Sequence, residues 1–148
     1  MYFISFIAST TLALGLSVAA IPSPVNTANG VVSLAEMKAW VDRQDPSKIT
    51  IIGDPFNALG RRAGSVTVTF CTQVSGTICS GSCTVQSGNG QCLATPGTNC
   101  LFATSNVAFC DSSTCGGSCN EFDSCGTVLE NGFCDTPGTK GVAIPFSA

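Results

Sequence analysis

The fold is decided by residues 66–100, which read VTVTFCTQVSGTICSGSCTVQSGNGQCLATPGTNC. The landmarks of this stretch return in the same order in residues 105–140, which read SNVAFCDSSTCGGSCNEFDSCGTVLENGFCDTPGTK. Phe-Cys, Cys-x-x-x-Cys, Asn-Gly-x-Cys and Thr-Pro-Gly-Thr recur in both stretches at similar spacing. Self-similarity of this kind indicates an internal duplication. The sequence therefore predicts two related modules, at about residues 66–100 and 105–140.

The turn residues of both copies predict β-structure. Asn89-Gly90 and Asn131-Gly132 are the dipeptide that a type I′ hairpin turn prefers, because both positions need a positive φ. Each Thr-Pro-Gly-Thr suits a type II turn, in which Pro fixes φ and Gly supplies a positive φ. Val66–Phe70 is a β-branched run that ends in an aromatic residue, which is typical of a strand. We therefore predict a small, disulfide-rich, mainly β fold composed of two related β-hairpin modules.

All ten cysteines lie in this part of the chain. Residues 63–148 are rich in Gly, Ser and Thr, so the apolar core that they can bury is marginal. An even number of cysteines in a small exported domain predicts a disulfide framework, in which each bridge contributes about 2–4 kcal/mol. The predicted disulfide residues are Cys71, Cys79, Cys83, Cys92, Cys100, Cys110, Cys115, Cys119, Cys125 and Cys134.

The pairing of these cysteines stays open at the level of sequence. Four cysteines are shared by the two copies, and each copy has one extra, Cys100 in the first and Cys125 in the second. Cys125 belongs to additional residues that the second copy carries between Cys119 and Asn131. The simplest pairing joins the shared cysteines within each copy and links Cys100 to Cys125 across the copies.

The two Cys-x-x-x-Cys segments also fit the spacing of zinc sites. The chain has no His, so a zinc site would have to consist of cysteines alone. Export and the even cysteine count favour disulfides over metal ligands. We expect neither a metal nor another cofactor.

The N-terminal part of the chain reads as targeting and processing segments. Residues 1–20 are apolar or small and end in Ser17-Val18-Ala19-Ala20, which is typical of a cleaved secretory signal peptide. A membrane anchor is the alternative, but the run is shorter than the ~20 apolar residues that a span needs. Residues 21–62 resemble a pro-segment, because they end in the dibasic pair Arg61-Arg62 in a Gly-containing loop. Cleavage there would leave a mature domain at residues 63–148 in the extracellular space.

One helix is predicted in the pro-like segment. Ser33 and Glu36 have the spacing of a capping box. Leu34, Met37, Trp40 and Val41 then form an apolar stripe, until Asp45-Pro46 ends the helix. Residues 49–52 form a short β-like run. We expect a helix and a strand that cover the domain during folding, and partial disorder is the alternative.

The residues available for catalysis are few. Without His there is no Ser-His or Cys-His nucleophile. Residues 63–148 contain no Arg and only one Lys, against five carboxylates, a net charge of −4. This charge argues against nucleic acid and against anionic membranes as partners. Two carboxylate pairs, Glu121 with Asp123 and Glu130 with Asp135, could act as a glycosidase couple, although ordinary surface charge explains them as well. We expect the protein not to be an enzyme.

The blocks Asn106–Asp111, Cys115–Cys119 and Phe133–Thr139, with the export signal and Arg61-Arg62, resemble small secreted cysteine-rich proteins of filamentous fungi, particularly mushroom-forming ones. The resemblance covers about residues 63–148 and implies an extracellular effector-like, elicitor, cell-wall or signalling role. It departs from hydrophobins, because the chain has no Cys-Cys doublet.

Three functional hypotheses follow. The first is a secreted, non-catalytic interaction module that presents disulfide-held loops to an extracellular protein or a cell-wall component. The second is a protease inhibitor whose rigid loop, at residues 84–91 or 126–133, occupies an active site. The third is a small hydrolase. Once the signal is removed, we expect no membrane span.

Overall fold

The computed structural model describes residues 31–57, 59 and 64–145. The predicted signal peptide and Arg61-Arg62 lie outside these residues. The described residues form one α-helix and seven strands, with three short 3₁₀ turns. Their bounds are α1 (Leu34–Asp42), η1 (Pro46–Lys48), β1 (Ile49–Ile52), β2 (Val66–Ser75), β3 (Ile78–Gly88), β4 (Cys92–Ala103), β5 (Ala108–Cys110), β6 (Cys119–Glu121), η2 (Phe122–Ser124), η3 (Glu130–Gly132) and β7 (Cys134–Ala143). The mainly β fold with one N-terminal helix is confirmed.

The internal duplication is visible in the order of the strands. All seven strands form one sheet in the order β1-β3-β2-β4-β7-β5-β6. Within it β2 lies between β3 and β4, and β5 lies in the same way between β6 and β7. We call residues 66–103 the first half and residues 108–143 the second half. The halves meet where β4 pairs antiparallel with β7, so the sheet has approximate two-fold symmetry about this pairing.

The predicted Thr-Pro-Gly-Thr turns lie at the seam between the halves. Thr98 pairs with Thr139, which places both segments side by side inside β4 and β7. Gly97 has φ 73° and Gly138 has φ 78°, as a type II turn requires. The register shifts on either side of Thr98 show that these turns act as bulges within long strands.

The two Asn-Gly pairs behave differently. Asn131 and Gly132 have φ angles of 61° and 80°, and they form the predicted tight turn. Asn89-Gly90 was expected to join two paired strands, and this expectation is wrong. It connects β3 to β4, which lie on opposite sides of β2. The type I′ preference depends on two neighbouring residues, whereas strand pairing depends on all the strands available to the sheet. Here β2 pairs with both β3 and β4 and so separates them.

Five disulfides use all ten cysteines. The predicted Cys100–Cys125 bridge is not formed, because each of the two extra cysteines pairs with a shared cysteine of its own half. The prediction that the shared cysteines pair within each copy is therefore right for one bridge in each half only, and the two shared cysteines left over, Cys92 and Cys115, bond to each other across the halves. The cysteines of the two Cys-x-x-x-Cys segments are bonded to other sulfurs, so none of them is a free thiolate ligand. The bridges are Cys71–Cys83, Cys79–Cys100, Cys92–Cys115, Cys110–Cys119 and Cys125–Cys134.

Two of these bridges are equivalent in the two halves. Cys71 lies directly opposite Cys83 on β2 and β3, and Cys110 lies directly opposite Cys119 on β5 and β6. Their Cα–Cα distances are both 4.1 Å. Cys92–Cys115 is the bridge that links the halves. Five disulfides in so small a protein fit an extracellular location.

The pro-like segment is built into the same core. The capping box is confirmed, since the Glu36 backbone N–H donates to Ser33 Oγ at 3.1 Å and the Ser33 N–H donates to the Glu36 carboxylate at 2.7 Å. Trp40 packs on Phe102 of the first half and Phe133 of the second, with ring centroids 5.5 Å and 4.9 Å apart. The two phenylalanines stack at 3.9 Å. Helix α1 therefore covers the seam where the halves meet.

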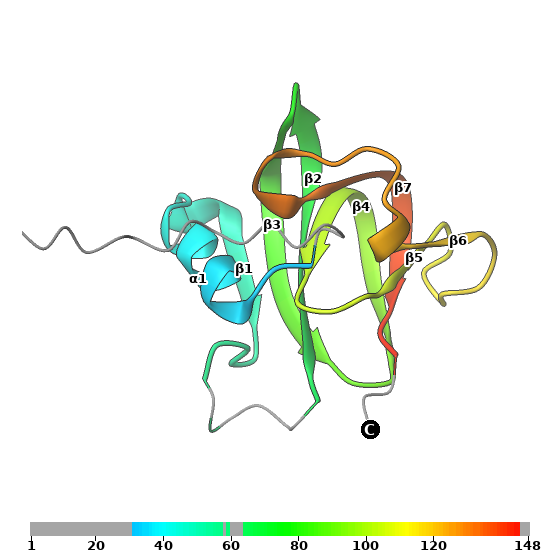
Figure 1. The fold of residues 1–148 in the computed structure, drawn as a ribbon, viewed down its shortest axis with the longest axis horizontal. Coiled ribbons are helices and arrows are strands. Elements are labelled where there is room, and N and C mark those ends of the chain that lie inside the picture. The colour runs from blue at the N-terminus through cyan, green and yellow to red at the C-terminus, as the bar shows by residue number, and fades with distance from the viewer. Residues whose placement is uncertain (1–30, 58, 60–63, 146–148) are drawn as a thin grey trace, which may run out of the picture.

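Strand β1 extends the sheet at one edge. Ile49–Ile52 pairs in parallel with Cys83–Gln86 of β3. Asp45 precedes it and caps η1, and the hydrogen bonds from the backbone and hydroxyl of Ser47 hold the pKa of Asp45 below its ordinary value. Figure 1 shows α1 and β1 on one side of the molecule and β6 on the other.

Cleavage after Arg62 stays a prediction. Because every cysteine lies between Cys71 and Cys134, such a cut would leave residues 31–57 attached by packing and hydrogen bonds alone. Among the residues described, no helix has both the length and the apolar character needed to cross a membrane.

Candidate binding site

The two loops expected to present a binding surface have different structures. Thr84–Gly88, most of the proposed 84–91 loop, is strand, and β3 is paired with β1 on one side and β2 on the other. Its backbone is therefore occupied and cannot enter the active site of a protease. The 126–133 stretch does form a loop, and Cys125–Cys134 closes it. We call residues 125–134 the 125–134 loop.

The main chain of the 125–134 loop is held on its inner side. Val128 and Cys134 form an antiparallel bridge. The Leu129 N–H donates to the Phe133 carbonyl at 2.7 Å, and the Asp135 N–H donates to the Thr127 carbonyl at 2.9 Å. These bonds flank the Val128–Cys134 pair, which is therefore a non-hydrogen-bonded pair. In such a pair the N–H and C=O of Val128 point away from β7.

The side chains of the loop divide between the core and the solvent. Leu129 and Phe133 are buried and anchor the loop, and Phe133 belongs to the aromatic cluster under α1. Val128 is 62% exposed. A β-branched apolar side chain at this exposure contributes little to the core. Its main chain and its side chain are therefore both presented outward.

A contact with the first half holds the tip of the loop. The Glu130 N–H donates to the Thr77 carbonyl at 2.9 Å, and the Thr77 hydroxyl donates to the Glu130 carboxylate at 3.1 Å. Thr77 lies in the turn between β2 and β3. The loop is thus fixed by a disulfide at its base and by two hydrogen bonds at its tip, so its outward conformation is preorganised.

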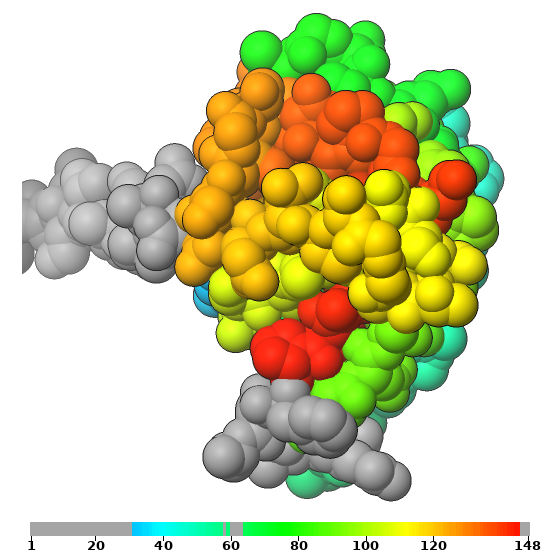
Figure 2. All heavy atoms as spheres, turned by 90° about the vertical axis from the view of Figure 1, so that its right-hand side faces the viewer, coloured from blue at the N-terminus to red at the C-terminus, as the bar shows by residue number. Residues whose placement is uncertain are grey.

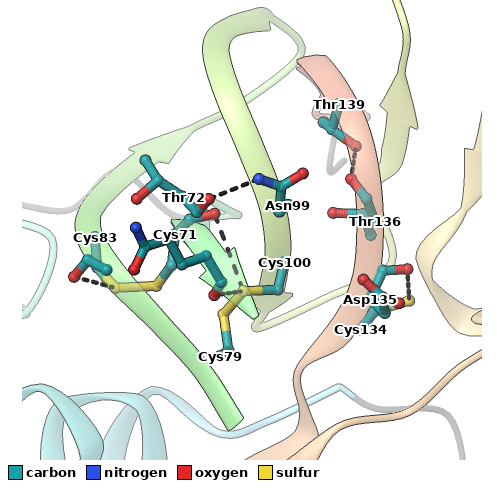
Figure 3. The surroundings of a disulfide bond; sticks show 12 residues. Cys71, Thr72, Cys79, Cys83, Asn99, Cys100, Cys134, Asp135, Thr136 and Thr139 are labelled. Carbon is teal, nitrogen blue, oxygen red and sulfur yellow. Dashed lines mark hydrogen bonds between the residues drawn. A yellow bond between two sulfur atoms is a disulfide. The ribbon is translucent and has the colours of Figure 1, made fainter. Parts of the chain in front are cut away.

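A polar groove of about 510 Å³ lies beside the loop. It runs over the ends of β2 and β7 with Asn99 of β4 between them. The Asn99 side-chain amide donates to the Thr72 carbonyl at 2.6 Å, which fixes its orientation, as Figure 3 shows. Asp135 belongs to both features, because it lines the groove and its backbone N–H donates to the Thr127 carbonyl of the 125–134 loop. The lining residues are Thr72, Gln73, Val74, Ser75, Asn99, Asp135 and Pro137.

The carboxylates considered as a catalytic couple have separate surroundings. The Glu121 carboxylate accepts from the Asn106 side-chain amide at 2.8 Å, and the Asp123 backbone N–H donates to Asn106 Oδ1 at 3.0 Å. The Asn106 side chain thus bonds the Glu121 carboxylate and the Asp123 backbone at the start of η2, whereas the Asp123 carboxylate accepts from the Ser124 hydroxyl at 3.2 Å. Glu130 is bonded to Thr77, whereas Asp135 lines the groove. Among the residues described, Asp135 is the one carboxylate in that groove.

Figure 2 looks onto the side of the molecule where the loops of the second half, yellow to orange, cover the surface. Sequence reasoning found the 126–133 stretch through its Asn-Gly turn and the additional residues around Cys125. It missed the groove, because the residues that line it come from three strands. It also missed the outward orientation of Val128, which depends on the register with Cys134.

Comparisons with known proteins do not identify the chain. No model of a protein family, no curated protein and no solved structure matches it.

Proposed function

We propose that the protein is a secreted, non-catalytic binding module that presents the 125–134 loop to an extracellular partner. The observation that carries this proposal is the combination at Val128, where an exposed apolar side chain and an outward main chain stand on a loop closed by a disulfide. A loop already held in its bound conformation loses little entropy on association. Outward main-chain groups are best satisfied by another polypeptide, which favours a protein over a cell-wall polymer as the partner.

The wider properties of the chain support this role. The resemblance to small secreted cysteine-rich proteins of filamentous fungi implies an effector-like role outside the cell. Export would remove residues 1–20, and a cut after Arg62 would follow. The intact mass of the secreted protein reports both events.

A second candidate, a protease inhibitor, is favoured by the same loop. Proteases bind extended main chain, and a disulfide-closed loop resists the opening that turnover requires. A hydrolase is the least supported role, since the Glu121 and Asp123 carboxylates lie at an exposed turn and each accepts a hydrogen bond from a different side chain, Asn106 and Ser124.

The test compares two charge substitutions at exposed apolar positions. Val128→Asp changes the loop, and Ile51→Asp, at a site 47% exposed on β1, is the matched control. The immobilised wild-type protein is exposed to secreted proteins and to cell-wall fractions, and the retained component is identified, purified and titrated. We expect Val128→Asp to weaken binding at least ~10-fold, as burying an unpaired charge at an interface does, while Ile51→Asp binds as the wild type does.

Equal affinity of the wild type, Val128→Asp and Ile51→Asp for the retained component would contradict the proposal. So would a hydrolytic activity that is lost in Glu121→Gln or Asp123→Asn while the five disulfides stay intact.

A further inference from the structure

The short segment Thr127–Leu129 has the features that a serine protease recognises in its substrate. Proteases of this class take the peptide in an extended form and place the carbonyl of the residue before the scissile bond in an oxyanion hole. The N–H and C=O of Val128 point away from β7, because the bonds on either side of its pair with Cys134 leave the pair non-hydrogen-bonded. Leu129 follows in an extended conformation, with φ −96° and ψ 177°. A protease could therefore add its own strand to the outer side of this segment.

The outer side of the segment is accessible in the folded protein. The inward-facing carbonyl of Thr127 accepts from the Asp135 N–H, and the inward-facing N–H of Leu129 donates to the Phe133 carbonyl. Strand β5 pairs with the far end of β7, from Gly141 to Ala143, and leaves the end near Cys134 to this segment. Within the described residues, no strand pairs with the outer side of Val128.

The side chain of Val128 selects the kind of specificity pocket. A pocket with a carboxylate at its base requires Lys or Arg, and a long hydrophobic slot is filled best by an aromatic ring. A small apolar pocket of the elastase type fits a short aliphatic side chain. Val128 is aliphatic and 62% exposed, so it can enter such a pocket without rearrangement of the loop.

The loop is also built to resist cleavage. A cut after Val128 would leave one new end tied through Thr127 to Asp135 and the other through Leu129 to Phe133. Cys125–Cys134 closes the ring around the bond, and Glu130 is fixed to Thr77. The ends could not separate, so the cleft would stay occupied.

From these features we infer that the 125–134 loop inhibits an elastase-type serine protease, with Val128 in its specificity pocket. This inference rests on the proposed binding role of the loop and names the partner.

The test measures the hydrolysis of chromogenic peptides by elastase-type, chymotrypsin-type and trypsin-type proteases in the presence of the full, disulfide-bonded chain. We expect the wild type to inhibit the elastase-type enzyme with a Kd of about 1 µM or tighter, in the range of specific protein complexes. Val128→Lys should lose this inhibition by at least ~100-fold and gain inhibition of the trypsin-type enzyme, because the charge now matches the other pocket.

Ile51→Lys provides the control, since it places the same charge at an exposed apolar site on β1. It should inhibit the elastase-type enzyme as the wild type does and should not gain inhibition of trypsin. Peptide maps without reduction would confirm the same five bridges in all three proteins.

Two outcomes would overturn the inference. One is no inhibition of the elastase-type enzyme by the wild type together with no gain by Val128→Lys. The other is rapid cleavage between Val128 and Leu129. If another partner still binds in a manner that depends on Val128, only this inference fails and the binding role stands. Binding whose affinity does not change when Val128 is substituted would contradict both this inference and the proposed binding role of the loop.

Discussion

The two halves of the sheet share a cysteine pattern but use it differently. In the first half the three strands have 10, 11 and 12 residues, whereas in the second half β5 and β6 have 3 residues each and only β7 is long. Because β5 and β6 are short, more of the second half lies in surface loops, including the 125–134 loop. A duplicated unit can thus keep long paired strands in one copy and form surface loops in the other.

The equivalent disulfides show the same division. Cys71 and Cys83 are both buried, whereas Cys119 is exposed and only Cys110 is buried on the other side. The first bridge is part of the core and the second fastens the edge of the sheet. We therefore expect the first bridge to contribute more to stability than the second.

The largest expected effect is at the seam that joins the halves. Trp40 is 5% exposed and contacts one phenylalanine from each half. Trp40→Ala should lower the free energy of unfolding by about 3–5 kcal/mol, the range for a large aromatic residue removed from a core. Chemical denaturation followed by circular dichroism measures it.

The control for this variant lies on the same helix. Lys38→Ala removes an exposed i,i+4 ion pair with Asp42 and should cost no more than ~0.5 kcal/mol. A loss from Trp40→Ala as small as that from Lys38→Ala would mean that α1 does not hold the seam.

The second expected effect compares the equivalent disulfides. Loop closure alone predicts a similar loss for each, about 3 kcal/mol, because the cysteines are 12 and 9 residues apart. The double variant Cys71→Ala/Cys83→Ala should lose about 1 kcal/mol more than Cys110→Ala/Cys119→Ala, since it also removes buried sulfur atoms from the core. The midpoints of urea unfolding give both values, and the reverse order would contradict the division between the halves.

The smallest expected effect lies where the halves are alike. Thr95 and Thr136 are equivalent, fully buried, and their hydroxyls have no hydrogen-bond partner within the described structure. Thr95→Val and Thr136→Val should each leave stability unchanged or raise it by up to ~1 kcal/mol, because no bond is lost and no polar group stays buried.

Thr139→Val is the matched control. Its hydroxyl donates to the Thr136 carbonyl at 2.8 Å, so its loss should cost about 1 kcal/mol. Thermal unfolding compares the three variants. Losses of similar size at all three positions would show that the hydroxyls of Thr95 and Thr136 are bonded after all.

The local features of the sequence predicted much of this fold. The capping box at Ser33 and Glu36, the buried face of α1 and the Asn131-Gly132 turn all depend on residues within one or two turns of each other. The Asn89-Gly90 hairpin and the Cys100–Cys125 bridge were wrong, because both depend on which strands become neighbours. Strand neighbours are fixed by packing over long sequence separations, which a local pattern does not contain.

The sequence by itself determined the duplication, the mainly β class, the cysteine framework and the stretch in which the 125–134 loop lies. These follow from residue types at fixed spacings. Only the tertiary structure decided that α1 covers a seam between two halves, that the cysteines pair as they do, and that the main chain of Val128 faces outward. The first two depend on packing and strand pairing between segments far apart in the chain. The third depends on the register of Val128 with Cys134, because one residue of shift would turn every side chain and every peptide group to the opposite side.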